Sequence, residues 1–302
     1  FPFYGSDGTG GDTRLTITNV GPAGAGVGTA TTISNNLNVH LFFLDNTCAQ
    51  ADVYLCFSKF QSYSFKASEW DPVTKRGELI AIPVDAMGYP ISYNGLIGNA
   101  FVNTTVGTDK WVGNYSPEAF SSRGTLDNLG NFQLDPNAAA NGLANANLLL
   151  NNGPLNQITG LDAGADKLAV EIQSPVDSKN QAILTMGLNG SIGGALSGNA
   201  AAGTGVIYRN DEKAFSFTPP GGGCSVLTLI NDASIRIVGG LSNSIGSGKT
   251  ATVVWNVAGP AVGLFVTPVQ ANSPWAGIRG LHKRDAAVNG RLAMPVFMPI
   301  CQ

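Results

Sequence analysis

The feature that most constrains this fold is a succession of short β-type runs separated by clusters of Gly, Pro, Asn and Asp. From Thr13 the sequence reads T-R-L-T-I-T-N-V, in which apolar Leu15 and Ile17 alternate with polar neighbours. A period of two is typical of a strand with one buried face. Further runs of this kind occupy residues 38–45, 53–58, 63–67, 78–85, 98–103, 167–173, 182–186, 214–218, 226–230, 234–238, 250–257 and 263–267. The pattern predicts an all-β chain built as an antiparallel β-sandwich.

The strands fall into two regions. Residues 1–125 form a first β-sandwich region and residues 166–302 a second β region. Between them, residues 126–165 are rich in Ala and Asn and show no period of two, so we expect a connection with one short helix within residues 136–150. A chain of 302 residues can bury one large core or two ordinary ones. The sequence is compatible both with two packed sandwiches and with one elaborated sandwich.

Four segments of the first region resemble the successive strands of a known fold. They are Thr16-Ile17-Thr18-Asn19, the run N-V-H-L-F-F-L-D at residues 38–45, S-F-K-A-S at 64–68 and G-E-L-I-A-I-P-V-D at 77–85. This order is similar to that of immunoglobulin-like β-sandwich domains in bacterial secreted and surface proteins of unassigned role, and the resemblance covers roughly the first hundred residues. It implies a fold and a location, and it carries over no catalytic residue.

The composition argues against some classes of binding partner. Only 12% of the residues are charged, about half the share usual in soluble domains, and the net charge is -3. Nucleic acids and anionic membranes require a concentrated positive field, which this chain lacks. No apolar run reaches the roughly 20 residues of a membrane span. The chain begins at Phe1 without Met, so we expect the mature form of an exported, extracellular or cell-surface protein.

The cysteines also favour an oxidising compartment. Cys48, Cys56, Cys224 and Cys301 form an even set without a C-x-x-C pair, which suits disulfides better than a zinc site. Four cysteines allow three pairings. Nearness in the sequence favours Cys48 with Cys56, which leaves Cys224 for Cys301.

The C-terminal segment 292–300 carries an alternation of its own. Its large apolar residues, all at even positions, are Leu292, Met294, Val296, Met298 and Ile300. Pro295 and Pro299 occupy odd positions and remove backbone donors from one edge only. The segment therefore suits either the last edge strand of its own sheet or a strand added to a neighbouring subunit, a role that Leu15 and Ile17 at the other end of the chain could also serve.

No segment predicts catalysis, a cofactor or a metal ion. The G-S-G-K-T run at 246–250 has Asn243 where a phosphate loop needs Gly, and we interpret it as a hairpin turn. His40 and His282 have no nucleophile motif around them. The pairs Glu69 with Asp71 and Glu118 with Asp127 would have to converge for glycoside hydrolysis. Carboxylates in Gly-rich turns, which could hold a surface calcium ion, are Asp7, Asp12, Asp162 and Asp166.

Together these observations predict a structural subunit of an extracellular assembly rather than an enzyme. We expect self-association into a homopolymer, such as a surface filament or fimbrium, by β-strand addition between copies. The alternative is a carbohydrate-binding adhesin that stacks a glycan on one of its tryptophans, Trp70, Trp111, Trp255 or Trp275. A secreted hydrolase is the remaining alternative.

Overall fold

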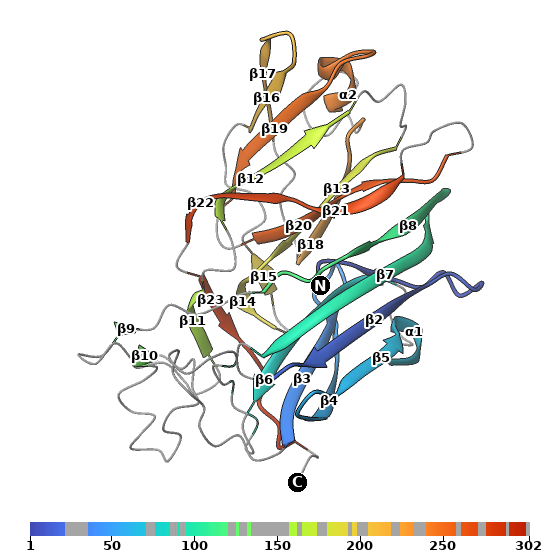
Figure 1. Ribbon diagram of the computed structural model, residues 1–302. Helices are drawn as coiled ribbons and strands as arrows, with labels where there is room; N and C mark the ends of the chain where they lie inside the picture. The colour runs from blue at the N-terminus through green and yellow to red at the C-terminus, as the bar shows by residue number, and fades with distance from the viewer. Residues whose placement is uncertain are drawn as a thin grey trace.

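A computed structural model shows an all-β chain (Figure 1). The structure describes residues 1–21, 36–70, 76–84, 88, 90, 93, 95–119, 125–126, 132–133, 157–161, 165–173, 180–192, 195–197, 205–218, 224–231, 240–257, 261–270, 276–287 and 290–299. Strands dominate and pair almost throughout in the antiparallel sense, the exception being β14 with β23. The all-β prediction is confirmed, while the immunoglobulin-like arrangement stays a prediction.

Two four-stranded sheets make up the first β region. One has the order β1 (Tyr4–Gly5), β6 (Arg76–Val84), β3 (Asn36–Leu44) and β4 (Gln50–Ser58). The other has the order β5 (Ser62–Lys66), β2 (Asp12–Asn19), β7 (Leu96–Val106) and β8 (Asp109–Tyr115). Alternate side chains of both sheets, among them Leu15 and Val39, enter one shared core. The helical turn α1 (Ala67–Trp70) follows β5.

The second β region contains a five-stranded and a four-stranded sheet. The first runs β17 (Ala214–Phe217), β16 (Gly205–Arg209), β19 (Ala251–Asn256), β12 (Ala165–Ile172) and β22 (His282–Ala287). The second runs β18 (Ser225–Leu229), β13 (Ala182–Gly187), β20 (Ala261–Thr267) and β21 (Gly277–Gly280). Side chains of both, including Trp255 and Phe265, share a core with α2 (Gly240–Ile245).

A small sheet lies beside the junction of the two regions. Its order is β11 (Gln157–Leu161), β23 (Gly290–Ala293), β14 (Asn189–Ser191) and β15 (Ala195–Ser197). The short pair β9 (Thr125–Leu126) and β10 (Phe132–Gln133) completes the described strands. The helix expected within 136–150 and the strand expected at 234–238 lie outside the described residues.

The two β regions share apolar cores rather than meeting at a thin linker. Strand β3 is buried on both faces, with Val39 and Leu41 in the core of the first region and Phe42 and Leu44 turned toward Met186 of the second. A continuous apolar run is expected of a strand in this position. β8 also lies against β21 of the second region.

One local prediction differs from the structure. The turn at Ser247 and Gly248 joins α2 to β19, so the hairpin predicted there is wrong. Glu69 lies in the helical turn α1, where its carboxylate accepts a hydrogen bond from the Lys66 N–H at 3.0 Å. In the described part of the chain no helix has the length and apolarity that crossing a membrane requires.

Candidate functional site

The C-terminal segment begins as an interior strand of the small sheet. β23 pairs with β11 on one side and with β14 on the other. Its Leu292 is fully buried, and Met294, just beyond the strand, is 1% exposed. Both pack into one apolar cluster with Phe42 of β3 and Ile80 of β6. This end of the chain therefore packs against the first β region.

Beyond Ala293 the chain leaves the strand ladder and continues as residues 294–299, which we call the C-terminal arm. Val296 is half-buried, Phe297 is 51% exposed and Met298 is 77% exposed, whereas Pro299 is buried. The alternation seen in the sequence thus ends at Met294. Ile300, the last residue of that pattern, lies outside the described residues.

The arm lies over a docking surface formed by His40, Tyr54 and Gly88. The Tyr54 hydroxyl donates a hydrogen bond to the Phe297 carbonyl at 2.7 Å. Gly88 has a φ of +89°, and a Cβ placed on it would lie 2.0 Å from the same carbonyl oxygen. Only glycine can therefore occupy position 88 while the arm keeps this path.

His40 is the buried polar centre of the docking surface. Its Nε2–H donates to the Asp52 carboxylate at 2.9 Å. Its ring stacks on that of Tyr54 with centroids 4.1 Å apart, and the Phe297 ring stands edge-on at 6.2 Å. Burial lowers the pKa of His40 below its ordinary value of 6.5, and Asp52 offsets part of that change. His40 is therefore a buried packing residue.

The pKa of His40 predicts a loss of stability in mild acid. Because the folded state holds this proton more weakly than the unfolded chain does, the free energy of unfolding should fall as pH drops below 6.5. The slope for one proton cannot exceed about 1.4 kcal/mol per pH unit. Urea unfolding of His40→Gln and of the control His282→Gln, measured from about pH 7.5 to about pH 5, checks this. An unchanged slope in His40→Gln would show that another group is responsible.

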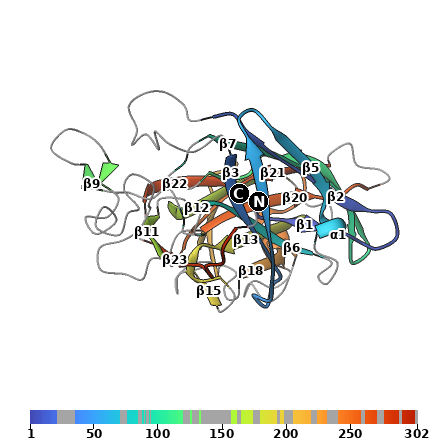
Figure 2. The same cartoon turned by 90° about the horizontal axis from the view of Figure 1, so that it is seen from below.

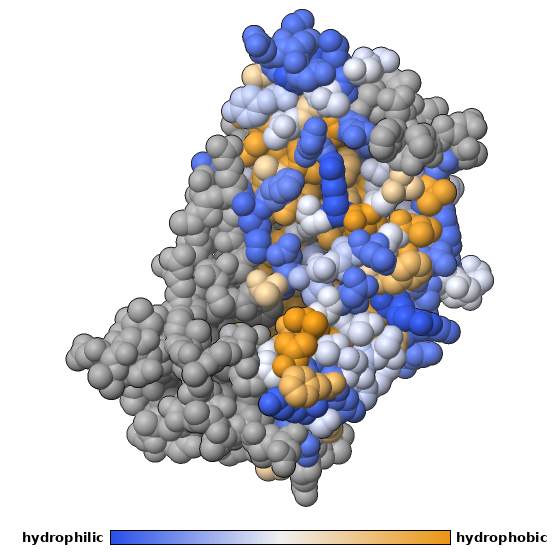
Figure 3. All heavy atoms as spheres, in the orientation of Figure 1, coloured by the Kyte–Doolittle hydropathy of each residue, from blue (hydrophilic) through white to orange (hydrophobic). Residues whose placement is uncertain are grey.

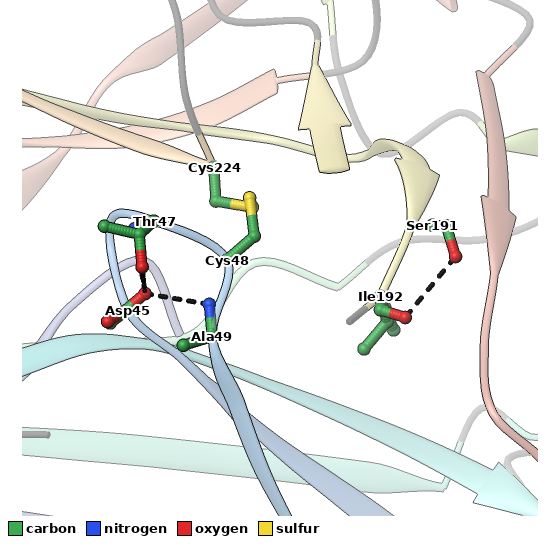
Figure 4. Close-up of a disulfide and its surroundings, with 7 residues drawn as sticks. All are labelled: Asp45, Thr47, Cys48, Ala49, Ser191, Ile192 and Cys224. Atoms are coloured by element: carbon green, nitrogen blue, oxygen red, sulfur yellow. Dashed lines mark hydrogen bonds between the residues drawn. A yellow bond between two sulfur atoms is a disulfide. The ribbon is translucent and has the colours of Figure 1, made fainter. Parts of the chain in front are cut away.

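A disulfide joins Cys48, in the turn between β3 and β4, to Cys224 (Figure 4). The predicted pairing of Cys48 with Cys56 is therefore wrong, as is that of Cys224 with Cys301. Cys48 lies in the β3–β4 turn while Cys56 is far along β4, about 20 Å of strand away, and a disulfide requires Cα atoms within about 7 Å. The Cα atoms of Cys48 and Cys224 are 5.5 Å apart.

Cys56 is also disulfide-bonded, to a partner outside the described residues, where Cys301 lies as well. Disulfides persist in oxidising compartments. They indicate a protein that functions outside the cytoplasm.

The turn that carries Cys48 is organised by a single carboxylate. Asp45 Oδ1 accepts hydrogen bonds from the Thr47 N–H, the Thr47 hydroxyl and the Ala49 N–H (Figure 4). Cys48 adopts a φ of +68°, uncommon for a residue other than glycine, and its side chain points to β18. Asp7 forms the same three bonds with Thr9 and Gly11. In each turn the aspartate carboxylate is therefore engaged by donors of the turn itself.

Among the carboxylates named as calcium or catalytic candidates, Asp7, Asp12, Glu69 and Glu118 have structural partners, and Asp166 is part of the strand β12. Asp12 accepts hydrogen bonds from the backbone and hydroxyl of Ser68, and Glu118 pairs with Lys283 at 2.9 Å. In the described part of the chain no three His, Cys, Asp or Glu residues gather as metal ligands would. Residues outside the described part are Asp71, Asp127 and Asp162.

The N-terminal candidates for strand addition lie inside a sheet. β2 pairs with β5 on one edge and with β7 on the other, and Leu15 and Ile17 are 0% and 2% exposed. A strand that is already paired on both edges has no free edge to offer. The C-terminal arm is the better-placed candidate.

The tryptophans proposed as a glycan platform are mainly core residues. Trp111 and Trp255 are each 1% exposed, and Trp70 is half-buried against Phe65. Trp275 lies outside the described residues. None of the three described tryptophans presents the open face that stacking on a sugar requires.

A hollow beside β20 and β21 has Gln173, Gln181 and Arg279 among its lining residues. The Arg279 guanidinium donates to the Glu171 carbonyl and lies 5.0 Å from the Phe265 ring. Arg279 is the only charged residue among the described residues that line this hollow, and it is already engaged within the fold.

One buried acid, Glu78, was not among the candidate residues identified from the sequence. Glu78 is fully buried on the β6 face that also carries Ile80 and Ile82, and burial raises its pKa well above the usual range. The run G-E-L-I-A-I could have predicted this burial, because a period of two places Glu78 on an apolar face. It faces the shared core rather than an open site.

Comparison of the chain with models of known protein families, with curated proteins and with solved structures gave no match.

Proposed function

We propose that this chain is a structural subunit of an extracellular assembly, most simply a surface filament. In that assembly the C-terminal arm of one copy lies on the docking surface of the next copy. The observation that carries the proposal is the arm itself, which leaves the strand ladder after Ala293 and still exposes Phe297 and Met298 to solvent. Exposed apolar side chains on an extended segment favour association.

The position of the arm supports contacts made at one end of the subunit. The chain returns from the second β region, and the arm reaches the far end of the first region, at the bottom of Figure 1. Seen from that end, the C-terminus lies toward the viewer, over the first region (Figure 2). An arm at this end can reach a neighbouring copy whose own docking surface, at the same end of that copy, lies beside it.

Exchange of the arm between copies requires no contacts other than those that the arm makes within one chain. The bond from Tyr54 to the Phe297 carbonyl and the close approach at Gly88 can form within one chain or between two. Swapping an identical element conserves its contacts and is a low-cost route to oligomers. The two-copy interface would then also cover Phe297 and Met298. An extracellular location agrees with the disulfides and the low charge.

Replacing Met298 with Ser tests the proposal with little risk to folding. Because Met298 is 77% exposed, we expect the free energy of unfolding to change by less than about 0.5 kcal/mol. The assembled fraction in sedimentation velocity and negative-stain images should fall. The matched control is Phe60→Ser, at a residue 69% exposed in the β4–β5 turn. Equal assembly of the two variants would refute a role for the arm.

A further inference from the structure

β18 is an edge strand without the features that usually protect an edge. Among the described residues it pairs only with β13, in even register over all five residues, and it reads S-V-L-T-L. Natural edges are protected by charge, proline, bulges or short length. The other described edge strands of at least five residues have a charge, a glycine or a register shift: β4 with Asp52, β5 with Lys66, β8 with Lys110, β11 with Gly160 and β22 with Lys283.

The backbone groups of β18 that face outward follow from its pairing. The Ile230 N–H donates to the Gln181 carbonyl at 2.9 Å, and the Gly187 N–H donates to the Cys224 carbonyl at 3.2 Å. Antiparallel pairing alternates between residues that bond to one neighbour and residues that bond to the other. Residues 224, 226, 228 and 230 therefore face β13. The N–H and C=O groups of Ser225, Leu227 and Leu229 point away from β13, to an edge that no described strand occupies.

The exposure of the β18 side chains is consistent with an edge that binds a partner. Leu227, at the centre of the strand, is 41% exposed, whereas Thr228 is buried. Leu227 shares its sheet face with buried Leu184, its partner on β13. In Figure 2 β18 lies toward the margin of the view, outside β13 and β20.

We propose that β18 pairs with β18 of a second copy of this chain, antiparallel and across a two-fold axis at Leu227. A second copy is the occupant because the edge is self-complementary. When Leu227 faces Leu227 of the second copy, the N–H of each donates a hydrogen bond to the C=O of the other. Each Ser225 then faces a Leu229. The pairing also brings the two exposed Leu227 side chains together and places no charge opposite another.

This contact is separate from the C-terminal arm. A two-fold contact closes a dimer, whereas exchange of the arm from one copy to the next is head-to-tail and can continue. A chain with both contacts can build a fibre whose repeating unit is a pair. Either contact can fail without the other, so the inference does not rest on the proposed function.

Cysteine cross-linking tests the register directly. In a hydrogen-bonded antiparallel pair the facing Cα atoms lie about 5.5 Å apart, within the range of a disulfide. Leu227→Cys should therefore give disulfide-linked dimers of the native full-length chain under mild oxidation, as seen by non-reducing electrophoresis. Ser225→Cys alone should not, because its copy lies four residues away, about 13 Å. Mixing Ser225→Cys chains with Leu229→Cys chains should restore the cross-link.

Absence of the Leu227→Cys dimer, or equal cross-linking of Ser225→Cys alone, would overturn this pairing. In a second measurement, Leu227→Lys should abolish the dimer in sedimentation equilibrium, since two ammonium groups would then face each other. Tyr208→Lys is the matched control, because Tyr208 is 54% exposed but lies on the interior strand β16. Repeating the cross-linking in Met298→Ser separates the two contacts: the β18 dimer should persist there, and its loss would contradict their independence.

Discussion

Replacing Cys48 and Cys224 together with Ser is expected to lower the free energy of unfolding by about 4 kcal/mol. The disulfide joins residues 176 positions apart, and a cross-link over so long a loop removes much conformational freedom from the unfolded chain. It also fixes the β3–β4 turn of the first region to the start of β18 in the second. Urea unfolding of the double variant, compared with the parent, measures the effect.

Changing both cysteines avoids a stray thiol that could attack the disulfide of Cys56. Thr47→Ala is a useful comparison, since it removes a side-chain bond to Asp45 in the same turn but keeps the disulfide. It should cost about 1 kcal/mol. If the double variant unfolded at the same urea concentration as the parent, the disulfide would not join the two regions in the folded protein.

Leu292→Ala should lower the free energy of unfolding by roughly 2 to 5 kcal/mol. Leu292 is fully buried between the two regions, in the cluster that includes Phe42 and Ile80. Removing its branched end leaves a cavity that the strands on either side of β23 cannot close easily. Thermal or urea unfolding at several protein concentrations measures the loss.

Met298→Ala is the matched control for Leu292→Ala, because it shortens a side chain six residues further along that is 77% exposed. It should change the free energy of unfolding by less than about 0.5 kcal/mol. Similar effects of the two changes would mean that β23 is not packed in the core in solution.

The strands with clear alternation or continuous apolar runs could be predicted from the sequence. β2 follows the alternation of Leu15 and Ile17, and β3 follows the run V-H-L-F-F-L. β8 was missed because D-K-W-V-G-N-Y has a glycine where the apolar period would continue, and its burial comes from contact with β21. Local pattern could not reveal that distant contact.

The disulfide pairing and the course of the arm depend on tertiary placement. Nearness in sequence favoured Cys48 with Cys56, but an extended β4 separates them, and only the fold brings Cys224 to the turn. In the C-terminal segment the apolar alternation continues to Ile300, yet β23 ends at Ala293. Pro295 and Pro299 cannot donate to a ladder, which explains why pairing stops there.

The central claim is that the arm passes from one copy to the next. A photoreactive phenylalanine analogue at position 297 would cross-link to the docking surface around Tyr54, because the two are in contact. Isotopically light and heavy chains are unfolded together in equal amounts, refolded and allowed to assemble, and the cross-linked peptides are weighed by mass spectrometry. We predict pairs that join one light and one heavy peptide in the assembled material. Pairs of like isotope alone would show that each arm stays on its own chain, and would contradict the proposal.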